Sequence, residues 1–197
     1  MKKQILAISI IFILFLAVPL SLYAGSATDA VQTEVEKILT KLRNPEFKQK
    51  NREEKIAGIR QIINEIFDWT ELSKRTLARN WKKFEPEQRK EFTDLFSKLL
   101  EGVYADRLLA YSDEKVVFEK ETNLPKGKVE VASHILLADG KKVPLDYRMV
   151  QKDGKWRVYD VVIEGVSMVK NYRGQFKELL SKGSPADLIE TLKKKTS

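Results

Sequence analysis

Few residues in this chain have the types and spacing that catalysis or metal binding requires. The chain has no cysteine, which excludes disulfides, thiolate zinc sites, a cysteine nucleophile and a lipid-modified N-terminal cysteine. His134 is the only histidine, so a His-rich metal site is excluded and a catalytic triad would depend on that one position. The sequence also lacks a glycine-rich phosphate loop, an HExxH pattern and a GxSxG pattern. We therefore expect no catalytic residue, no metal and no cofactor.

Asp160 is the residue whose surroundings would best suit acid–base chemistry. It follows Tyr159 in a segment that is apolar on both sides, and a carboxyl group in such a setting can serve as a general base. The alternative is a structural aspartate, which backbone amides or an arginine such as Arg173 would hold. We favour the structural role for Asp160, and for His134 as well, and predict that the protein is not an enzyme.

The N-terminal segment has the layout of a secretory signal peptide. Two lysines precede the apolar run Ile5–Leu16, and a proline and several small residues follow. We predict cleavage after Ala24, with Ala27 as the second choice, so that residues 1–24 are removed and the mature chain lies outside the cytoplasm. The alternative is an uncleaved membrane anchor, because residues 5–23 approach the length that spans a bilayer.

The chain is basic, with 36 lysines and arginines against 28 acidic residues and a net charge of +8. Removal of residues 1–24 takes away two lysines and no acid, which lowers the net charge to +6. Because the mature chain is exported, we expect it to bind no nucleic acid. Acidic membrane surfaces, anionic lipid head groups and acidic proteins remain as partners, and solubility alone explains the charge equally well.

The periodicity of apolar residues predicts helices, then strands, then helices. Helical spacing recurs in residues 31–42, 56–67 and 69–81, and most persistently in residues 86–108. Asn44-Pro45 ends the first of these helices, Asp68 caps the third, and Pro86 suits the first turn of the fourth.

Between residues 113 and 164 the apolar period changes to two, which predicts four strands joined by short turns. Asp139-Gly140 and Asp153-Gly154 suit tight hairpins, and Gly165 ends the sheet. The predicted fold is α+β, with a four-stranded curved antiparallel sheet packed against several helices. Residues 25–197 form a single domain, mainly helical in residues 25–112, with the sheet in residues 113–164 and C-terminal helices in residues 165–197.

Three stretches together resemble the MlaC family of periplasmic phospholipid carriers, also called the toluene-tolerance family. The first runs from Phe67 to Trp81, and the second begins at Glu85 with Pro-Glu-Gln-Arg and continues to Tyr104. The third and most specific is DGKWRVYDVVIEGVS, which begins at Asp153 and is followed by Asn-Tyr-Arg at residues 171–173. The resemblance covers essentially all of the mature chain. One departure is Glu85, where the family more often has Thr or Ser, and this weakens a helix cap.

The resemblance implies an NTF2-like (cystatin-like) sheet and a deep pocket between sheet and helices, which holds lipid acyl chains while the head group stays near solvent. It implies a soluble periplasmic carrier, exported by a cleaved signal peptide, that shuttles phospholipid and so maintains outer-membrane lipid asymmetry. The implied partners are an outer-membrane lipoprotein–porin complex and an inner-membrane ABC transporter with an MCE-domain subunit. We expect a monomer. Burial of each CH₂ group stabilises the lipid by about 0.8 kcal/mol, so such a carrier must shield the acyl chains from water in a dry pocket. This task needs no catalytic residue.

We expect apolar positions from the matched stretches to line this lipid-binding pocket, and we expect about half of our choices to be plain core. The choices are Leu72, Trp81, Phe96, Leu99, Tyr104, Tyr147, Met149, Val161, Ile163, Val169 and Tyr172. If Met149 lines the pocket, Met149→Glu would abolish lipid retention in a folded protein. Three alternatives stay open. The first is a carrier for another apolar lipid such as a hopanoid, and the second is an NTF2-like enzyme with Asp160 as base and a tyrosine as oxyanion donor. The third is a purely structural envelope protein, which would bind no ligand.

Overall fold

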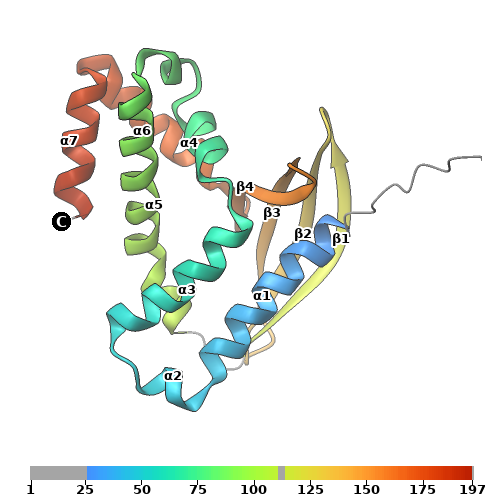
Figure 1. Ribbon diagram of the computed structural model, residues 1–197. Helices are drawn as coiled ribbons and strands as arrows, with labels where there is room; N and C mark the ends of the chain where they lie inside the picture. The colour runs from blue at the N-terminus through green and yellow to red at the C-terminus, as the bar shows by residue number, and fades with distance from the viewer. Residues whose placement is uncertain (1–25, 111–113, 197) are drawn as a thin grey trace, which may run out of the picture.

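The computed structural model describes residues 26–110 and 114–196, and it consists of helices packed against an antiparallel sheet (Figure 1). In chain order the elements are α1 (Ala27–Arg43), α2 (Pro45–Gln49), α3 (Arg52–Ile66), α4 (Trp69–Leu77), the 3₁₀ helix η1 (Ala78–Lys83), α5 (Pro86–Leu109), β1 (Lys115–Leu124), β2 (Lys128–Leu136), β3 (Lys142–Lys152), β4 (Lys155–Ile163), β5 (Val166–Ser167), α6 (Met168–Lys182) and α7 (Pro185–Thr196). The predicted α+β class and the order of helices, strands and helices are confirmed. The expected signal peptide lies outside the described residues. None of the helices in the described ranges is long and apolar enough to cross a membrane.

Polar side chains and a proline set the starts of the helices. The Ser26 hydroxyl accepts a hydrogen bond of 3.0 Å from the backbone N–H of Asp29 at the start of α1. Pro86 occupies the first turn of α5, as predicted, where its missing N–H removes no helical hydrogen bond. The Gln88 side chain accepts from the backbone N–H of Glu85 at 3.0 Å. The start of α5 therefore keeps a capping hydrogen bond although Glu85 departs from the family pattern.

Asp68 fixes the corner between α3 and α4. Its side chain is buried, and Oδ1 accepts from the backbone N–H of Glu71 at 3.0 Å, which caps α4 as predicted. Its Oδ2 lies 2.8 Å from Nζ of Lys152 in the sheet. The backbone N–H of Asp68 also donates to the carbonyl of Val158 in β4 at 2.9 Å. This one residue therefore ties a helix start to two strands.

We expect Asp68→Ala to lower the free energy of unfolding by about 2 kcal/mol, because the cap of α4 and the partner of Lys152 are both lost. Asp68→Asn keeps an oxygen for the cap, so it should recover about half of that loss. Urea denaturation of the two purified variants measures both effects. Equal losses would show that the cap contributes nothing measurable.

The sheet has the strand order β1-β2-β3-β4-β5, with each strand antiparallel to its neighbour. Four strands were expected, and the fifth is the two-residue strand β5. Glu164 and Gly165 adopt positive φ angles of 48° and 80°, which reverse the chain and bring β5 back onto the end of β4. Gly165 therefore turns the sheet and does not end it.

The β3–β4 hairpin combines a predicted turn with a bulge. Asp153 and Gly154 have φ angles of 50° and 73°, as a tight two-residue hairpin requires. Arg148 pairs with Asp160 and Met149 pairs with Val158, so Tyr159 is the extra residue of a β-bulge. The bulge interrupts the alternation of β4, and all residues from 158 to 162 are buried.

The described residues form two hydrophobic cores. The main core joins the sheet to α1, α4, α5, α6 and α7 around an aromatic cluster with ring centroids 5.1–5.7 Å apart. The members of this cluster are Phe84, Phe92, Phe96, Tyr172 and Phe176.

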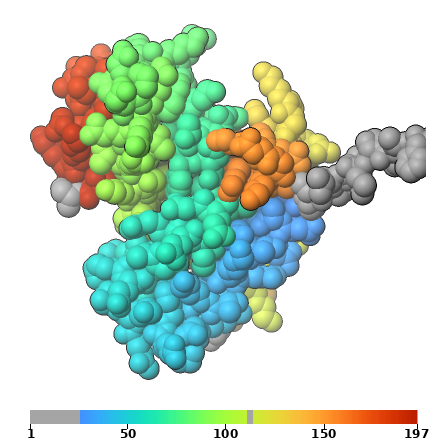
Figure 2. Space-filling view, in the orientation of Figure 1, coloured from blue at the N-terminus to red at the C-terminus, as the bar shows by residue number. Residues whose placement is uncertain are grey.

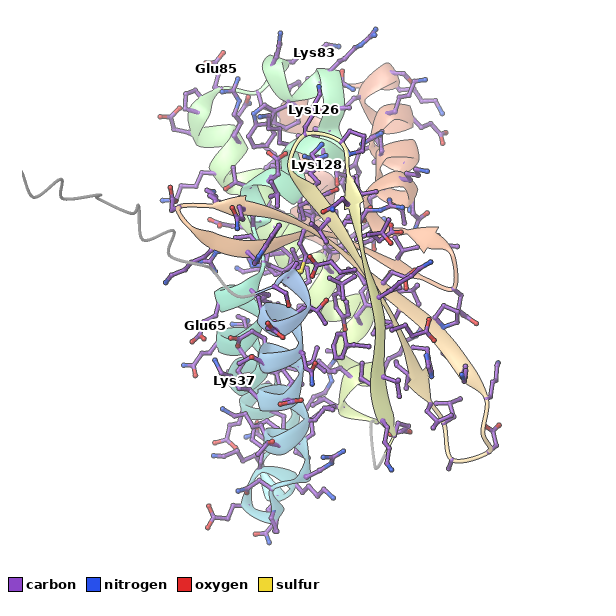
Figure 3. All side chains as sticks on the ribbon, turned by 90° about the vertical axis from the view of Figure 1, so that its right-hand side faces the viewer. Lys37, Glu65, Lys83, Glu85, Lys126 and Lys128 are labelled. Atoms are coloured by element: carbon purple, nitrogen blue, oxygen red, sulfur yellow. The ribbon has the colours of Figure 1, made fainter. Side chains whose placement is uncertain are left out.

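The smaller core contains Leu42, Phe47 and Ile59 and joins α1, α2 and α3. Gly58 permits this packing, because a Cβ there would lie 2.9 Å from the Phe47 ring. Figure 2 shows α2 at one end of the molecule, away from α7. On the surface, Nζ of Lys37 in α1 lies 3.5 Å from Oε2 of Glu65 in α3. Figure 3 shows these two side chains on neighbouring helices. An exposed pair of this kind adds little stability, so apolar packing holds these three helices together.

Candidate functional site

An apolar cavity of about 630 Å³ lies between α3, α5 and the sheet. Its apolar lining consists of Ile56, Ile59, Ile63, Phe67 and Trp69 from α3 and the start of α4, Leu100, Tyr104, Ala105, Leu108 and Leu109 from α5, Ile135, Val143, Leu145, Val161 and Ile163 from the sheet, and Met168 at the start of α6. The volume is typical of small-molecule sites, which occupy roughly 300–1,000 Å³. Such walls favour an apolar ligand.

The pairing of the strands places the sheet residues of the cavity on one face. Ile135 of β2 lies opposite Val143 of β3, and Leu145 of β3 lies opposite Ile163 of β4. Residues that pair across strands point to the same side of a sheet. The period-two pattern of the sequence therefore assigns these side chains to the face that the helices cover.

Polar residues form the rim of the cavity: Arg60, Asn64, Asp94, Ser97, Lys98, Glu101, Arg107 and Glu164. Arg60 of α3 donates two hydrogen bonds to Glu101 of α5, from Nε to Oε2 and from Nη2 to Oε1, both 2.5 Å long. These hydrogen bonds raise the pKa of the Arg60 guanidinium above its ordinary value. The Trp69 indole donates to Oδ1 of Asn64 at 2.7 Å. The rim therefore combines charged groups with an apolar interior.

The structure brings three of the predicted pocket residues into the cavity lining, namely Tyr104, Val161 and Ile163. The other eight lie outside the lining. Leu72, Phe96, Tyr147, Met149, Val169 and Tyr172 are buried in the main core, and Trp81 and Leu99 pack against that core while half-buried. Whether the three lining residues contact a ligand stays a prediction.

The expectation for Met149 has to be corrected. Its side chain has an exposed fraction of 0% and belongs to the main core, so it does not line the cavity. Met149 and Leu145 lie on the same face of β3. Leu145 pairs with Ile163 of the lining, whereas Met149 pairs with Val158, on the other side of the bulge. A glutamate there would place a charge in a closed core, and we expect loss of folding rather than selective loss of a ligand.

Sequence reasoning missed the α3 wall of the cavity. One face of a predicted helix contains Ile56, Ile59 and Ile63. Helical spacing alone does not distinguish a face that packs in a core from one that lines a cavity. The same holds for Leu100 and Leu108 in the second half of α5. The family-like stretches that guided our choices supply part of the lining, whereas all of α3 lies before the first of them. Their apolar lining residues are Phe67, Trp69, Leu100, Tyr104, Val161 and Ile163.

Asp160 is held as a structural residue. It is 2% exposed, and its Oδ2 accepts from the Ser167 hydroxyl at 2.6 Å and from Nη1 of Arg148 at 3.1 Å. Its Oδ1 accepts from the backbone N–H of Val169 at 2.9 Å. Both carboxylate oxygens are engaged, and Asp160 does not line the cavity. The geometry required of a general base facing a bound substrate is therefore not met.

Two other polar residues also have structural partners. The arginine on Asp160 is Arg148 and not Arg173, which instead donates two hydrogen bonds of 3.0 Å and 2.7 Å to the carbonyl of Arg75. His134 is buried, and its Nδ1 lies 2.8 Å from the Glu119 carboxylate without the geometry of a hydrogen bond. Within residues 26–110 and 114–196 no group of three or more His, Asp or Glu residues could hold a metal ion.

Comparison with known proteins finds relatives along nearly the whole chain. The profile of a family described as MlaC protein matches residues 32–194. The chain is 26% identical over 204 residues to the intermembrane phospholipid transport system binding protein MlaC of Haemophilus influenzae. That alignment covers 100% of this chain and 94% of the relative. It is also 24% identical over 185 residues to the toluene tolerance protein ttg2D of Pseudomonas putida, in an alignment that covers 92% of this chain and 86% of that protein.

The fold also matches a solved structure. A phospholipid-binding protein from Ralstonia solanacearum, determined in complex with a phospholipid, superimposes with a TM-score of 0.80 at 27% sequence identity. The match covers 87% of this chain and 97% of that one. The sheet and its helices are therefore arranged as in a protein of which a lipid complex is known.

Proposed function

The chain belongs to the MlaC family, and on that premise we propose that it is a phospholipid-binding transport protein whose cavity holds the acyl chains of its ligand. The observation that carries this proposal is the cavity between α3, α5 and the sheet, which has apolar walls and a charged rim. The relative from Ralstonia solanacearum, with the same fold, was solved with a phospholipid bound. The relative from Haemophilus influenzae is named as the binding protein of a phospholipid transport system.

The physical task of such a protein is to shield acyl chains from water. Each CH₂ group that leaves water is stabilised by about 0.8 kcal/mol, so a free phospholipid crosses an aqueous compartment too slowly to be useful. Burial of the chains against isoleucine, leucine and valine side chains removes that barrier. The charged rim leaves the head group near solvent. No bond is made or broken, and we propose that the protein is not an enzyme.

We further propose that the protein acts in the periplasm after cleavage of residues 1–24 and carries phospholipid between the outer and inner membranes as a monomer. Its partners would be an outer-membrane lipoprotein–porin complex and an inner-membrane ABC transporter with an MCE-domain subunit. In this role it would maintain the lipid asymmetry of the outer membrane. The family membership supports these steps, and N-terminal sequencing of the exported protein tests the first of them. A chain that starts at Gly25 or Thr28 indicates cleavage, and an intact N-terminus would indicate an anchor.

We expect the exported protein, purified without detergent, to contain about one phospholipid per chain, as a single cavity of this size allows. Extraction with organic solvent followed by mass spectrometry measures the content and identifies the head group. A hopanoid in the extract would keep the carrier function and change the ligand. An empty extract from a folded, monodisperse protein would contradict the proposal.

A further inference from the structure

Two ion pairs join α3 to α5, and only one of them lies at the cavity. Arg60 and Glu101 both belong to the lining, and the side chains are 50% and 25% exposed. Arg52 and Asp106 form the second pair, with Nε 2.8 Å from Oδ1, and neither belongs to the lining. Both pairs join an arginine of α3 to a carboxylate of α5, so the Arg52–Asp106 pair serves as a comparison for the pair at the cavity.

We propose that Arg60 binds the phosphate of the lipid and that Glu101 occupies the same edge of the guanidinium when the cavity is empty. This inference rests on the proposed function and assigns a binding residue to it. Arg60 uses Nε and Nη2 to hold both carboxylate oxygens of Glu101. That fork of donors matches the oxygens of a phosphate as well as those of a carboxylate. The carboxylate of Glu101 thus takes the place that two phosphodiester oxygens would occupy.

The position of Arg60 fits the covalent structure of a phospholipid. Arg60 follows Ile59 in α3, and Ile56 and Ile63 lie one turn before and after it, all in the lining. In a phospholipid the phosphate lies between the acyl chains and the head group. When the chains fill the apolar interior, the phosphate must therefore lie where the apolar wall gives way to charged residues, which is where Arg60 lies.

The rim can also compensate the charge of the displaced carboxylate. Lys98 lies three residues before Glu101 on α5 and belongs to the same lining, so the two side chains are neighbours on the helix surface. With a lipid bound, Arg60 would face the phosphate and Lys98 would face Glu101. The cations Lys126 and Lys128 lie at the β1–β2 hairpin (Figure 3) and outside the lining, so the cations of the rim are Arg60, Lys98 and Arg107.

The test compares two lipids with identical acyl chains, dipalmitoylphosphatidylethanolamine and dipalmitoylglycerol, of which only the first has a phosphate. Delipidated protein is mixed with vesicles that contain the radiolabelled lipid, the vesicles are sedimented, and lipid that remains with the protein is counted. We expect Arg60→Gln to lower uptake of the phospholipid about tenfold, the effect of losing a hydrogen-bonded charge partner. Uptake of the diacylglycerol should not change. Glu101→Gln should raise phospholipid uptake several-fold, because the competing carboxylate is removed.

Arg52→Gln and Asp106→Asn are the matched controls, since they break the equivalent ion pair outside the cavity. Both should leave uptake unchanged. The inference is overturned if Arg52→Gln acts like Arg60→Gln, if Arg60→Gln lowers uptake of both lipids equally, or if Glu101→Gln lowers phospholipid uptake. Each of these results would mean that the pair only holds the helices together. Failure of the unmodified protein to take up either lipid would contradict the proposed function itself and is a distinct result.

Discussion

Replacement of Ile163 by Glu should abolish phospholipid binding and leave the protein folded. Ile163 is at the end of β4, half-buried, and lines the cavity. In the empty cavity a carboxylate there can stay hydrated. Acyl chains would displace that water and leave an unpaired charge in an apolar site, which costs several kcal/mol. A cost of about 3 kcal/mol already lowers affinity more than a hundredfold, so lipid should no longer copurify.

Two further variants separate binding from folding. Ile163→Met keeps the size and apolar character of the side chain, so lipid content should remain close to that of the unmodified protein. Met149→Glu places the same charge on the same sheet in a residue with no exposed surface, and we expect it not to fold. Circular dichroism together with mass spectrometry of the extracts distinguishes the three results. Normal lipid content in folded Ile163→Glu would show that the acyl chains do not reach this wall.

Most of the fold could be predicted from periodicity and turn residues. The long stripe in residues 86–108 became α5 (Pro86–Leu109), because a helix with one apolar face needs a core to cover it. Other helices supply that core, as where Phe96 packs against Tyr172 and Phe176 of α6. The turn at Asp153-Gly154 is a local property, since two positive φ angles are required there. Such features depend on a few neighbouring residues, so the sequence is sufficient to identify them.

Other features depend on contacts between distant segments. The bulge at Tyr159 adds a residue to β4 with no corresponding gap in its pattern of apolar residues. Strand β5 has only two residues, too few to show a period, and forms because the turn at Gly165 brings it against β4. Neither feature has a signature within its own segment.

The candidate site shows the same division. The alternation in β3 correctly assigns Leu145 and Met149 to one face of the sheet, but only Leu145 reaches the cavity. The difference depends on what lies over each residue. Met149 is fully buried in the main core. Leu145 lies at the cavity between the sheet and helices α3 and α5. A sequence pattern identifies the face of a strand, and tertiary packing decides which part of that face stays free.

Asp160→Ala should cause one of the largest losses of stability available in this chain, about 3 kcal/mol. Asp160 is 2% exposed and is the shared acceptor for Arg148, Ser167 and the backbone N–H of Val169. Removing one partner of a buried ion pair costs about 3–5 kcal/mol, because the remaining polar groups stay buried without a partner. The lower end of that range applies, since Arg148 keeps a second hydrogen bond of 2.7 Å to Glu130.

Asp160→Asn is the informative companion, because it is the substitution that would inactivate a general base with least damage to the fold. Here it should still cost about 2 kcal/mol, since the amide has one acceptor oxygen where the carboxylate offers two. Urea denaturation gives both free energies, and lipid content measured on the folded fraction should be unchanged because Asp160 lies outside the cavity lining. A stable Asp160→Ala variant, within about 0.5 kcal/mol of the unmodified protein, would mean that other contacts hold the start of α6 against β4. Loss of lipid from a stable variant would instead place Asp160 in the binding site.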